Sequence, residues 1–597
     1  MKLSIVARWR RSAAVVLLVA SATGVRAAEP AEPAAAPAAA RRFQIDIDAP
    51  RPWRRLLEDG LDLVRWQVDE RMTPELLRRL VAEAERAASD ALAAEGYFSA
   101  RVSSAIDEAG ETTAVRLHVD PGSRTHVAAV DLRYAGALAG DDADARKRRE
   151  QLERHWPLAV GAPFRQADWD QAKREALATL AGGRYAAAHI VESAARIDPE
   201  TQSARLEVTI DSGPVFRAGP VKTTGLKRYP ASIVENLNPL TPGAPYDEDS
   251  LILYQRRLLQ TGYFSTVHLA VDPDPAHAAA APLLVSVIEA RSQRIDTGLS
   301  FSTDTRLRLQ VDYANSDVDD RAYRLRAQLV ADTQRQSVET SLDTPPETGG
   351  VWYSLTTRLR AQDIQGERTR EAVVGVSRNW GVWSTPSQLS LTSHFEEKDI
   401  AGAAGESVHA VFAGYRYTFR ETDALVQPRR GVLGNVQFGG SVPGLSSRDF
   451  VRALGRATVL WPLGPNGDLA LRGDAGAVIA GSRTGIPTSF LFRAGGDQSV
   501  RGYAFESLGV RQGEAIVGGR YLLVGSVEYT RWVAPAWGAA VFMDAGDAFD
   551  EPGEFRAARG YGVGARWRSP IGPFRADLAY GERDKRLRLH FSVGFSF

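Results

Sequence analysis

The 597-residue chain has no cysteine, which excludes a disulfide framework and thiol chemistry. Its 73 basic and 73 acidic residues cancel, so no basic surface favours a nucleic-acid partner. Beyond the N-terminus no segment approaches the ~20 consecutive apolar residues of a membrane-spanning helix. The motifs Gly-x-Ser-x-Gly, His-Glu-x-x-His and Gly-Lys-Ser/Thr are also missing, and the nine histidines are scattered. We therefore expect neither an enzyme nor a metal or cofactor site.

The N-terminal residues predict an export signal followed by a segment with too few apolar side chains to form a hydrophobic core. Three arginines between residues 8 and 11 precede the apolar run 13–20, and residues 25–27 offer a small-residue cleavage site. This layout is typical of a secretory signal peptide over residues 1–27, because the apolar run is too short to span a membrane. Residues 28–42 are almost entirely Ala, Pro and Glu, which predicts a flexible leader.

The next part of the chain repeats one pattern three times: a helix that ends at a Gly-aromatic pair, two alternating strands and a turn. The aromatic positions Tyr97, Tyr185 and Tyr263 are 88 and 78 residues apart. Thr73 and Asp247 can cap the first and third helices. A nearly constant period indicates tandem copies of one structural unit. We expect three small α+β domains, over residues 43–123, 124–215 and 216–290.

Residues 291–597 predict an all-β transmembrane barrel. Helical periodicity stops after residue 290, and runs of about ten residues alternate apolar and polar side chains between turns rich in Gly, Pro, Asp and Asn. A crossing strand needs ~9–11 residues, so these 307 residues accommodate about 16 antiparallel strands with their loops. The alternation is typical of an outer-membrane barrel, with lipid outside and a polar lumen inside.

The last strand has the clearest alternation, with Phe591, Phe595 and Phe597 on its apolar face. The chain ends on an aromatic residue, as does the signal that the barrel-assembly machinery reads in many outer-membrane proteins. A barrel closes by pairing its first strand, expected around residues 294–301, with this last strand. Gly594 either bends the last strand and weakens that closure or relieves crowding.

One loop, residues 481–513, is too long for a hairpin turn and lies between the expected strands 469–480 and 516–529. It carries the tip Val500-Arg501-Gly502-Tyr503. We expect the loop to fold back into the barrel, with Arg501 pairing with acidic residues on the inner wall.

The tip residues suit such a role. Gly502 allows a sharp turn, and Tyr503 can pack on the wall with its hydroxyl bonded. We expect a wet lumen, in which the ion pair of Arg501 contributes about 0–1 kcal/mol, whereas a dry pair would cost about 3–5 kcal/mol to break.

Together, the three repeats, the barrel and the Arg-Gly-Tyr loop resemble the superfamily of insertases and secretion channels in which POTRA (polypeptide-transport-associated) domains precede a barrel. Residues 495–503 are most similar to the TamA-like subunits of the translocation and assembly module, which have three such repeats. The pattern Phe-x-Asp-x-Gly also matches, at Phe542, Asp544 and Gly546, and Glu528 matches an acidic wall residue. The resemblance implies that Asp544 and Glu528 face the lumen and hold Arg501.

The resemblance implies an outer-membrane protein of a Gram-negative bacterium, with its POTRA domains in the periplasm. It implies three partners: a TamB-like inner-membrane-anchored protein, client outer-membrane proteins such as autotransporters, and the lipid bilayer. A weak seam between first and last strand would open to lipid, and a client strand would pair with the exposed edge. Phospholipid transport is a further implied role. The alternative is a two-partner-secretion-type channel exporting one exoprotein, although such channels have two repeats and a plug helix.

Overall fold

The computed structural model describes residues 43–69, 71–109, 112–382, 384–424, 428–569 and 572–596. The expected signal peptide (1–27), the leader (28–42) and Phe597 lie outside the described residues. Among the helices that the structure describes, none is long and apolar enough to cross a membrane.

The first α/β unit has a three-stranded sheet in the order β1-β3-β2, with β1 parallel to β3. Thr73 caps the longest helix by accepting a hydrogen bond from the Leu76 N–H at 3.2 Å, and Gly96, with φ +94°, follows its end. The elements are β1 (Phe43–Asp48), α1 (Arg51–Gly60), α2 (Asp62–Arg65), η1 (Trp66–Val68), α3 (Pro74–Ala94), β2 (Arg101–Asp107) and β3 (Thr113–Asp120).

The second and third units repeat the same strand order, β4-β6-β5 and β7-β9-β8. Asp247 caps α7 by accepting from the Ser250 N–H at 2.8 Å. The second unit contains β4 (His126–Ala135), η2 (Gly136–Ala139), α4 (Ala143–Arg154), α5 (Gln166–Gly182), β5 (His189–Asp198) and β6 (Ser203–Asp211). The third contains β7 (Ala218–Thr224), α6 (Ser232–Asn236), α7 (Glu248–Gln260), β8 (Phe264–Val271), η3 (Pro275–Ala280) and β9 (Ala281–Glu289).

The sequence pattern missed the first strand of each unit. β1, β4 and β7 each occupy one edge of their sheet, beside the last strand of the same unit. For β1 and β7 this pairing is parallel and joins residues 62 to 70 positions apart, such as Phe43 with Thr113 and Ala218 with Ala281. The strands of each sheet fall within one of the expected ranges 43–123, 124–215 and 216–290.

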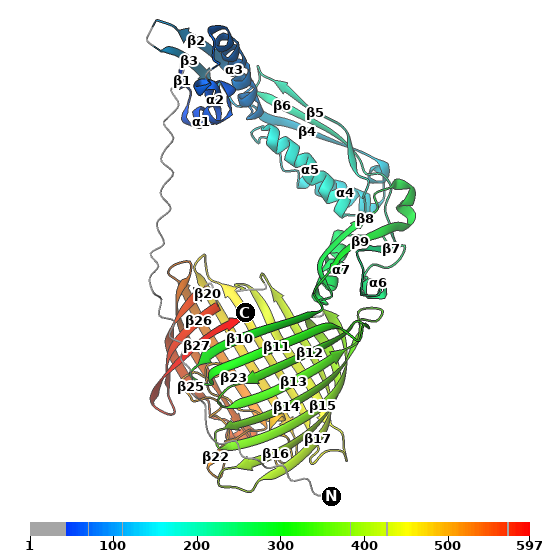
Figure 1. Cartoon of the computed structure of the whole chain (residues 1–597), viewed down its shortest axis with the longest axis vertical. Coiled ribbons are helices and arrows are strands. Elements are labelled where there is room, and N and C mark those ends of the chain that lie inside the picture. Colours follow the sequence, from blue (N-terminus) through cyan, green and yellow to red (C-terminus); the bar gives the residue numbers. More distant parts are fainter. Residues whose placement is uncertain are drawn as a thin grey trace. The chain divides into compact units, whose positions relative to one another are not determined.

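The rest of the described chain forms a closed barrel of 16 strands, in which β10 lies beside β27 (Figure 1). Neighbouring strands are antiparallel throughout, which confirms the expected fold class. The strands are β10 (Gln293–Ser302), β11 (Arg306–Val318), β12 (Tyr323–Ala331), β13 (Arg335–Asp343), β14 (Trp352–Ile364), β15 (Glu367–Val382), β16 (Thr385–Ile400), β17 (Glu406–Thr422), β18 (Gly431–Ser441), β19 (Val451–Pro462), β20 (Gly467–Ile479), β23 (Tyr521–Trp532), β24 (Trp537–Phe549), β25 (Ala558–Ser569), β26 (Gly572–Gly581) and β27 (Arg586–Ser596).

The barrel's outer face is apolar, whereas its inner face carries buried charged groups together with apolar side chains. On β27, Leu587 and Leu589 are 66% and 60% exposed, whereas His590 points inward and is 4% exposed. Leu359 and Phe438 on other strands are similarly exposed. An apolar band of this extent on an isolated chain indicates a surface that meets lipid.

The expected strand over residues 516–529 is wrong in its first part. β22 (Ala515–Val517) pairs with β21 (Val510–Gln512) in a separate two-stranded sheet, and the wall strand β23 begins only at Tyr521. Gly518 and Gly519 separate the two strands, and a Cβ on Gly519 would lie 2.5 Å from the Phe549 carbonyl oxygen. Apolar and polar residues alternate in both β22 and β23. The sequence pattern therefore did not show that β22 pairs with β21 and not with a strand of the barrel wall.

Glu289, the last residue of β9, provides a test of the third α/β unit by pH. Its side chain is 7% exposed. Burial alone would raise the pKa of this carboxylate, but the backbone N–H groups of Lys227, Arg228 and Tyr229 and the Arg228 guanidinium donate to it and lower the pKa from 4.5 to about 2. Because the folded pKa is depressed, this stabilisation is complete above pH 4.5 and is lost as the pH falls towards 2.

We predict that Glu289→Gln lowers the stability of β7–β9 by about 2–3 kcal/mol at pH 6 and by much less at pH 3. Hydrogen exchange of these strands in the full chain, compared between variant and wild type at each pH, measures the difference. An equal difference at both pH values would contradict this assignment.

Candidate functional site

The loop between β20 and β23 packs as an apolar body against the inner wall of the barrel. Its side chains Ile486, Phe490, Phe492, Val500, Tyr503 and Leu508 share one buried cluster with the wall residues Leu454, Val478, Leu522, Val524 and Ala548. Val500 and Tyr503 are 0% exposed. The structure therefore places the loop inside the barrel, and its packing is that of a core rather than of a solvated loop.

Arg501 lies at the centre of this loop tip. Its Nε and Nη2 donate to the two oxygens of Asp544, on β24, at 2.7 and 2.9 Å. Its Nη1 donates to Glu528 Oε2, on β23, at 2.6 Å. The structure thus brings together the guanidinium and both carboxylates that the sequence predicts, and the fork of Arg501 contacts Asp544 in a bidentate manner.

Two further wall residues complete the surroundings of Arg501. The guanidinium lies over the ring of Phe542, with 3.4 Å between its Cζ and the ring centroid. Asp577 on β26, which the sequence reading missed, accepts from Arg501 Nη1 at 3.2 Å. The alternation of this strand places Asp577 on the inward face, and that was the signal available in the sequence. The alternation does not show which residue of the loop contacts Asp577.

Gly546 has a different place from the other predicted wall residues. It lies two residues after Asp544 on β24, and a Cβ there would lie 2.6 Å from the Leu523 carbonyl oxygen of the adjacent strand. The described contacts of Arg501 do not include Gly546. The absence of a side chain at Gly546 lets β23 and β24 approach closely.

The expectation of a wet lumen around Arg501 is wrong. The Arg501 side chain is 6% exposed, and that of Asp544 is 0% exposed. The apolar loop residues and the Phe542 ring pack around the guanidinium. Arg566 adds a second cation, with Nη1 2.5 Å from Asp577 Oδ1 and Nη2 2.9 Å from Glu528 Oε2. Two guanidinium groups and three carboxylates therefore form one buried network, in which loss of a partner leaves an uncompensated charge.

The residues after Arg501 fit closely against β25–β27. Gly502 has φ +93°, and a Cβ on it would lie 2.7 Å from the Gly581 backbone nitrogen, so the tip requires glycine. The Gly502 N–H donates to His590 Nε2 at 3.0 Å. The Tyr503 hydroxyl donates to the Arg559 carbonyl at 3.0 Å and accepts from the Arg583 N–H at 3.0 Å.

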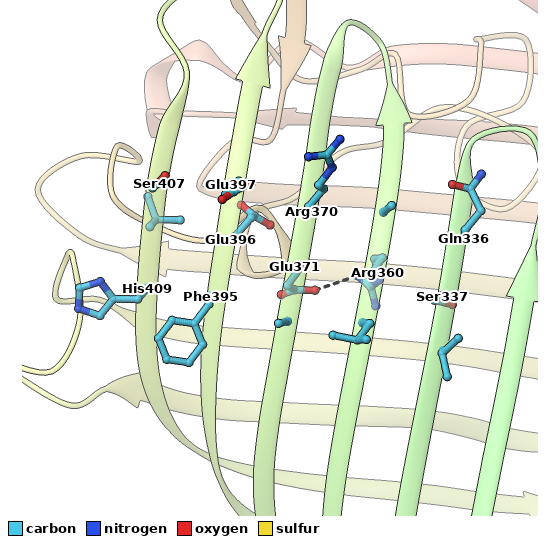
Figure 2. A pocket seen from close by; sticks show the side chains of 15 residues that line it. Gln336, Ser337, Arg360, Arg370, Glu371, Phe395, Glu396, Glu397, Ser407 and His409 are labelled. Carbon is cyan, nitrogen blue, oxygen red and sulfur yellow. Dashed lines mark ion pairs between the residues drawn. The ribbon is translucent and has the colours of Figure 1, made fainter. Parts of the chain in front are cut away.

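A second part of the loop, near Thr488, is held by β15 and β16. The Thr488 N–H donates to Glu396 Oε1 at 2.8 Å, and the Ser489 hydroxyl donates to Glu371 Oε1 at 2.6 Å. Figure 2 shows Glu371 directed towards Arg360, at 3.7 Å, with Glu396 on the neighbouring strand. The sequence reading missed this attachment. The loop is consequently fixed to β15–β16 through one segment and to β23–β26 through its tip.

The predicted C-terminal strand residues lie at the closure of the barrel. The Phe591 ring contacts that of Phe301 on β10 in a tilted arrangement, with 6.1 Å between ring centroids. Gly594 and Phe595 occupy register positions opposite Ser300 and Leu299 of β10. Phe597 lies outside the described residues.

Comparison with known proteins identifies relatives of this architecture. Residues 290–597 match the model of the Omp85 superfamily domain. Over 414 residues the chain is 24% identical to "Outer membrane protein assembly factor BamA" of Nitratidesulfovibrio vulgaris, a match that covers 65% of this chain and 52% of that protein. The chain thus spans about half the length of this relative.

Comparison with solved structures gives two matches for most of the chain. The crystal structure of BamA from Haemophilus ducreyi lacking POTRA domains 1–3 superposes with a TM-score of 0.61 at 16% identity, covering 78% of this chain and 99% of that one. CdiB from Acinetobacter baumannii superposes with a TM-score of 0.46 at 14% identity, covering 80% and 91%.

We predict that Arg501→Ala releases the loop tip, because Asp544 would be left buried without its cation. The expected loss in the free energy that holds the loop in place is about 3–5 kcal/mol. Arg501→Lys keeps the charge but not the fork of donors, so its loss should lie between those of Arg501→Ala and wild type. Cleavage of the loop by proteinase K in lipid vesicles measures the release. Arg511→Ala, an exposed arginine of the same loop, is the matched control. A loop as protected in Arg501→Ala as in wild type would show that the ion pair does not hold it.

Proposed function

The chain belongs to the Omp85 superfamily, and on that premise we propose that it is an outer-membrane insertase that assists the assembly of β-barrel proteins such as autotransporters. Insertion requires no bond-making chemistry. It requires a place where the backbone of a client strand can find hydrogen-bond partners while its side chains enter lipid, because unpaired backbone cannot remain in hydrocarbon.

The observation that carries this proposal is the short pairing of β10 with β27, here called the seam. Within the described residues the register of the seam joins Gly298–Ser302 to Ser592–Ser596, five residues on each strand, and Thr303 also bonds with Phe591. The other neighbouring strands of the barrel pair over eight to sixteen residues. Fewer backbone hydrogen bonds make the seam the place where the barrel opens at least cost.

The edge of β10 supports the same role. Residues 293–297 pair with β11 on one side, and their described pairings include none with β27 on the other. Ile295 in this stretch is 66% exposed. An unpaired strand edge is a template for another strand, so a client strand that adds to β10 gains backbone hydrogen bonds and extends the sheet into the membrane.

The buried loop gives the barrel its resting form. Arg501, with Asp544, Glu528 and Asp577, keeps the loop within the lumen, which supports an insertase working through its wall rather than a channel conducting through its centre. A two-partner-secretion-type channel would require the loop to leave that site so that an exoprotein could pass.

The finer assignment is a TamA-like subunit of the translocation and assembly module. It is supported by three α/β units before the barrel and by the tip sequence around Arg501. In this assignment the units lie in the periplasm of a Gram-negative bacterium and bind a TamB-like protein anchored in the inner membrane, and the pair also serves phospholipid transport.

Locking the seam tests the proposal. Phe301→Cys with Val593→Cys places two cysteines at paired positions of β10 and β27 in a chain that has no other cysteine. We expect the oxidised protein to assemble a client barrel in proteoliposomes at least tenfold more slowly than the same protein after reduction. Each single-cysteine variant is the control. Equal assembly before and after reduction would exclude insertion through the seam, and export of an unfolded exoprotein by the locked barrel would favour the channel.

A further inference from the structure

The loop tip also contacts both strands of the seam. Asp304 lies in the turn between β10 and β11, and its Oδ2 accepts a hydrogen bond from the Asp497 N–H of the loop at 2.7 Å. The side chain is 7% exposed. Gly496, with φ +102°, makes room for this contact, because a Cβ there would lie 2.4 Å from Asp304 Oδ2. The loop is thereby attached to the first strand of the barrel.

His590 provides the matching attachment on the last strand. It points inward from β27, and its side chain is 3% exposed. Its Nε2 accepts from the Gly502 N–H at 3.0 Å, directly after Arg501 in the chain. This acceptor role places the ring proton on Nδ1, which lies 3.6 Å from Asp304 Oδ1 across the seam. Loop, first strand and last strand therefore meet at one point.

These contacts lie at only one end of the seam. At that end Thr303 and Phe591 also exchange hydrogen bonds: the Thr303 N–H donates to the Phe591 carbonyl at 3.1 Å, and the Phe591 N–H donates to Thr303 Oγ1 at 3.3 Å. At the other end, where β9 leads into β10, residues 293–296 have no partner among the described residues of β27. The seam is thus held by side chains and the loop at one end, whereas the described residues show no pairing with β27 at the other.

We infer that Asp304 and His590 form a clasp through which the loop tip holds the two strands of the seam together, so that the seam opens from the β9 end and opens fully only when the loop lets go. This inference rests on the proposed function for the purpose of the seam. Asp304 and His590 act as positioning residues, because they set how far β10 and β27 separate and take no part in pairing with a client.

The energetic argument follows from burial. Separating β10 from β27 at this end leaves two buried polar side chains and two loop N–H groups without their hydrogen-bond partners. Each lost partner costs free energy unless water replaces it. A cavity of about 320 Å³ lies beside the clasp and is lined among others by Asp304, Tyr503 and His590, so these side chains have space to move apart. The clasp is therefore a barrier that a bound client can overcome, rather than a permanent bond.

Pulsed electron paramagnetic resonance across the seam tests the clasp. Spin labels at Leu307→Cys and Ala576→Cys lie on the strands that flank it, since Leu307 pairs with Phe301 and Ala576 with Phe591. Three interstrand spacings place the two backbones about 15 Å apart when the seam is closed. The full-length protein is measured in lipid nanodiscs, on the folded fraction.

We expect Asp304→Ala with His590→Ala to raise the long-distance population at least fivefold over the doubly labelled parent. Asp304→Ala alone should raise the long-distance population to a smaller extent. This single variant is the test if the double variant does not fold. Asp304→Asn with His590→Gln keeps both acceptors and should restore the parent distribution. Asp474→Asn, a wall residue on β20, is the control for loss of an inner carboxylate.

Two results would overturn the inference: an unchanged distance distribution in the alanine variants, or opening in the Asn/Gln pair as wide as in the alanine pair, which would mean that lost packing rather than the hydrogen bonds opens the seam. Neither result bears on the proposed function, which fails separately if a seam locked by a disulfide still inserts clients.

Discussion

The buried ion pairs of Arg501 are the interaction on which the position of the loop inside this barrel depends. The guanidinium of Arg501 lies over an aromatic ring and between carboxylates from three wall strands, in a part of the lumen closed to solvent. In water such pairs contribute little, but here the buried Arg501 and Asp544 depend on each other because burial removes most of their hydration. The long loop is therefore part of the barrel's core. Its position determines what the lumen contains and which strands the loop touches.

The barrel itself combines a strong wall with a short closure. Strands β14–β17 pair over eleven to sixteen residues and carry the attachment of the loop near Thr488. The opposite side holds the Arg501 network and ends at the five-residue seam. The loop therefore makes hydrogen bonds to both sides of the barrel, to β16 near Thr488 and to the seam at Asp304 and His590.

How much of this the sequence reveals depends on the range of the interaction. Alternation in strands such as Arg586–Ser596 predicted the barrel because lipid and lumen act on every residue, and the caps Thr73 and Asp247 were visible because capping is local. The first strands of the α/β units were missed because their partners are distant in sequence. Asp577, Asp304 and His590 were missed as partners of the loop, since only closure of the barrel brings their strands together. The burial of Arg501 was misjudged because it arises from how the loop's apolar side chains pack.

Solid-state NMR in lipid bilayers tests the central claim most directly, by measuring dipolar coupling between ¹⁵Nε of Arg501 and ¹³Cγ of Asp544, with Arg501→Lys identifying the signal. The account predicts strong coupling, since Nε lies 2.7 Å from the carboxylate oxygen. Loss of that coupling in a folded, membrane-embedded barrel would show that the loop rests outside the wall pocket and would contradict the account.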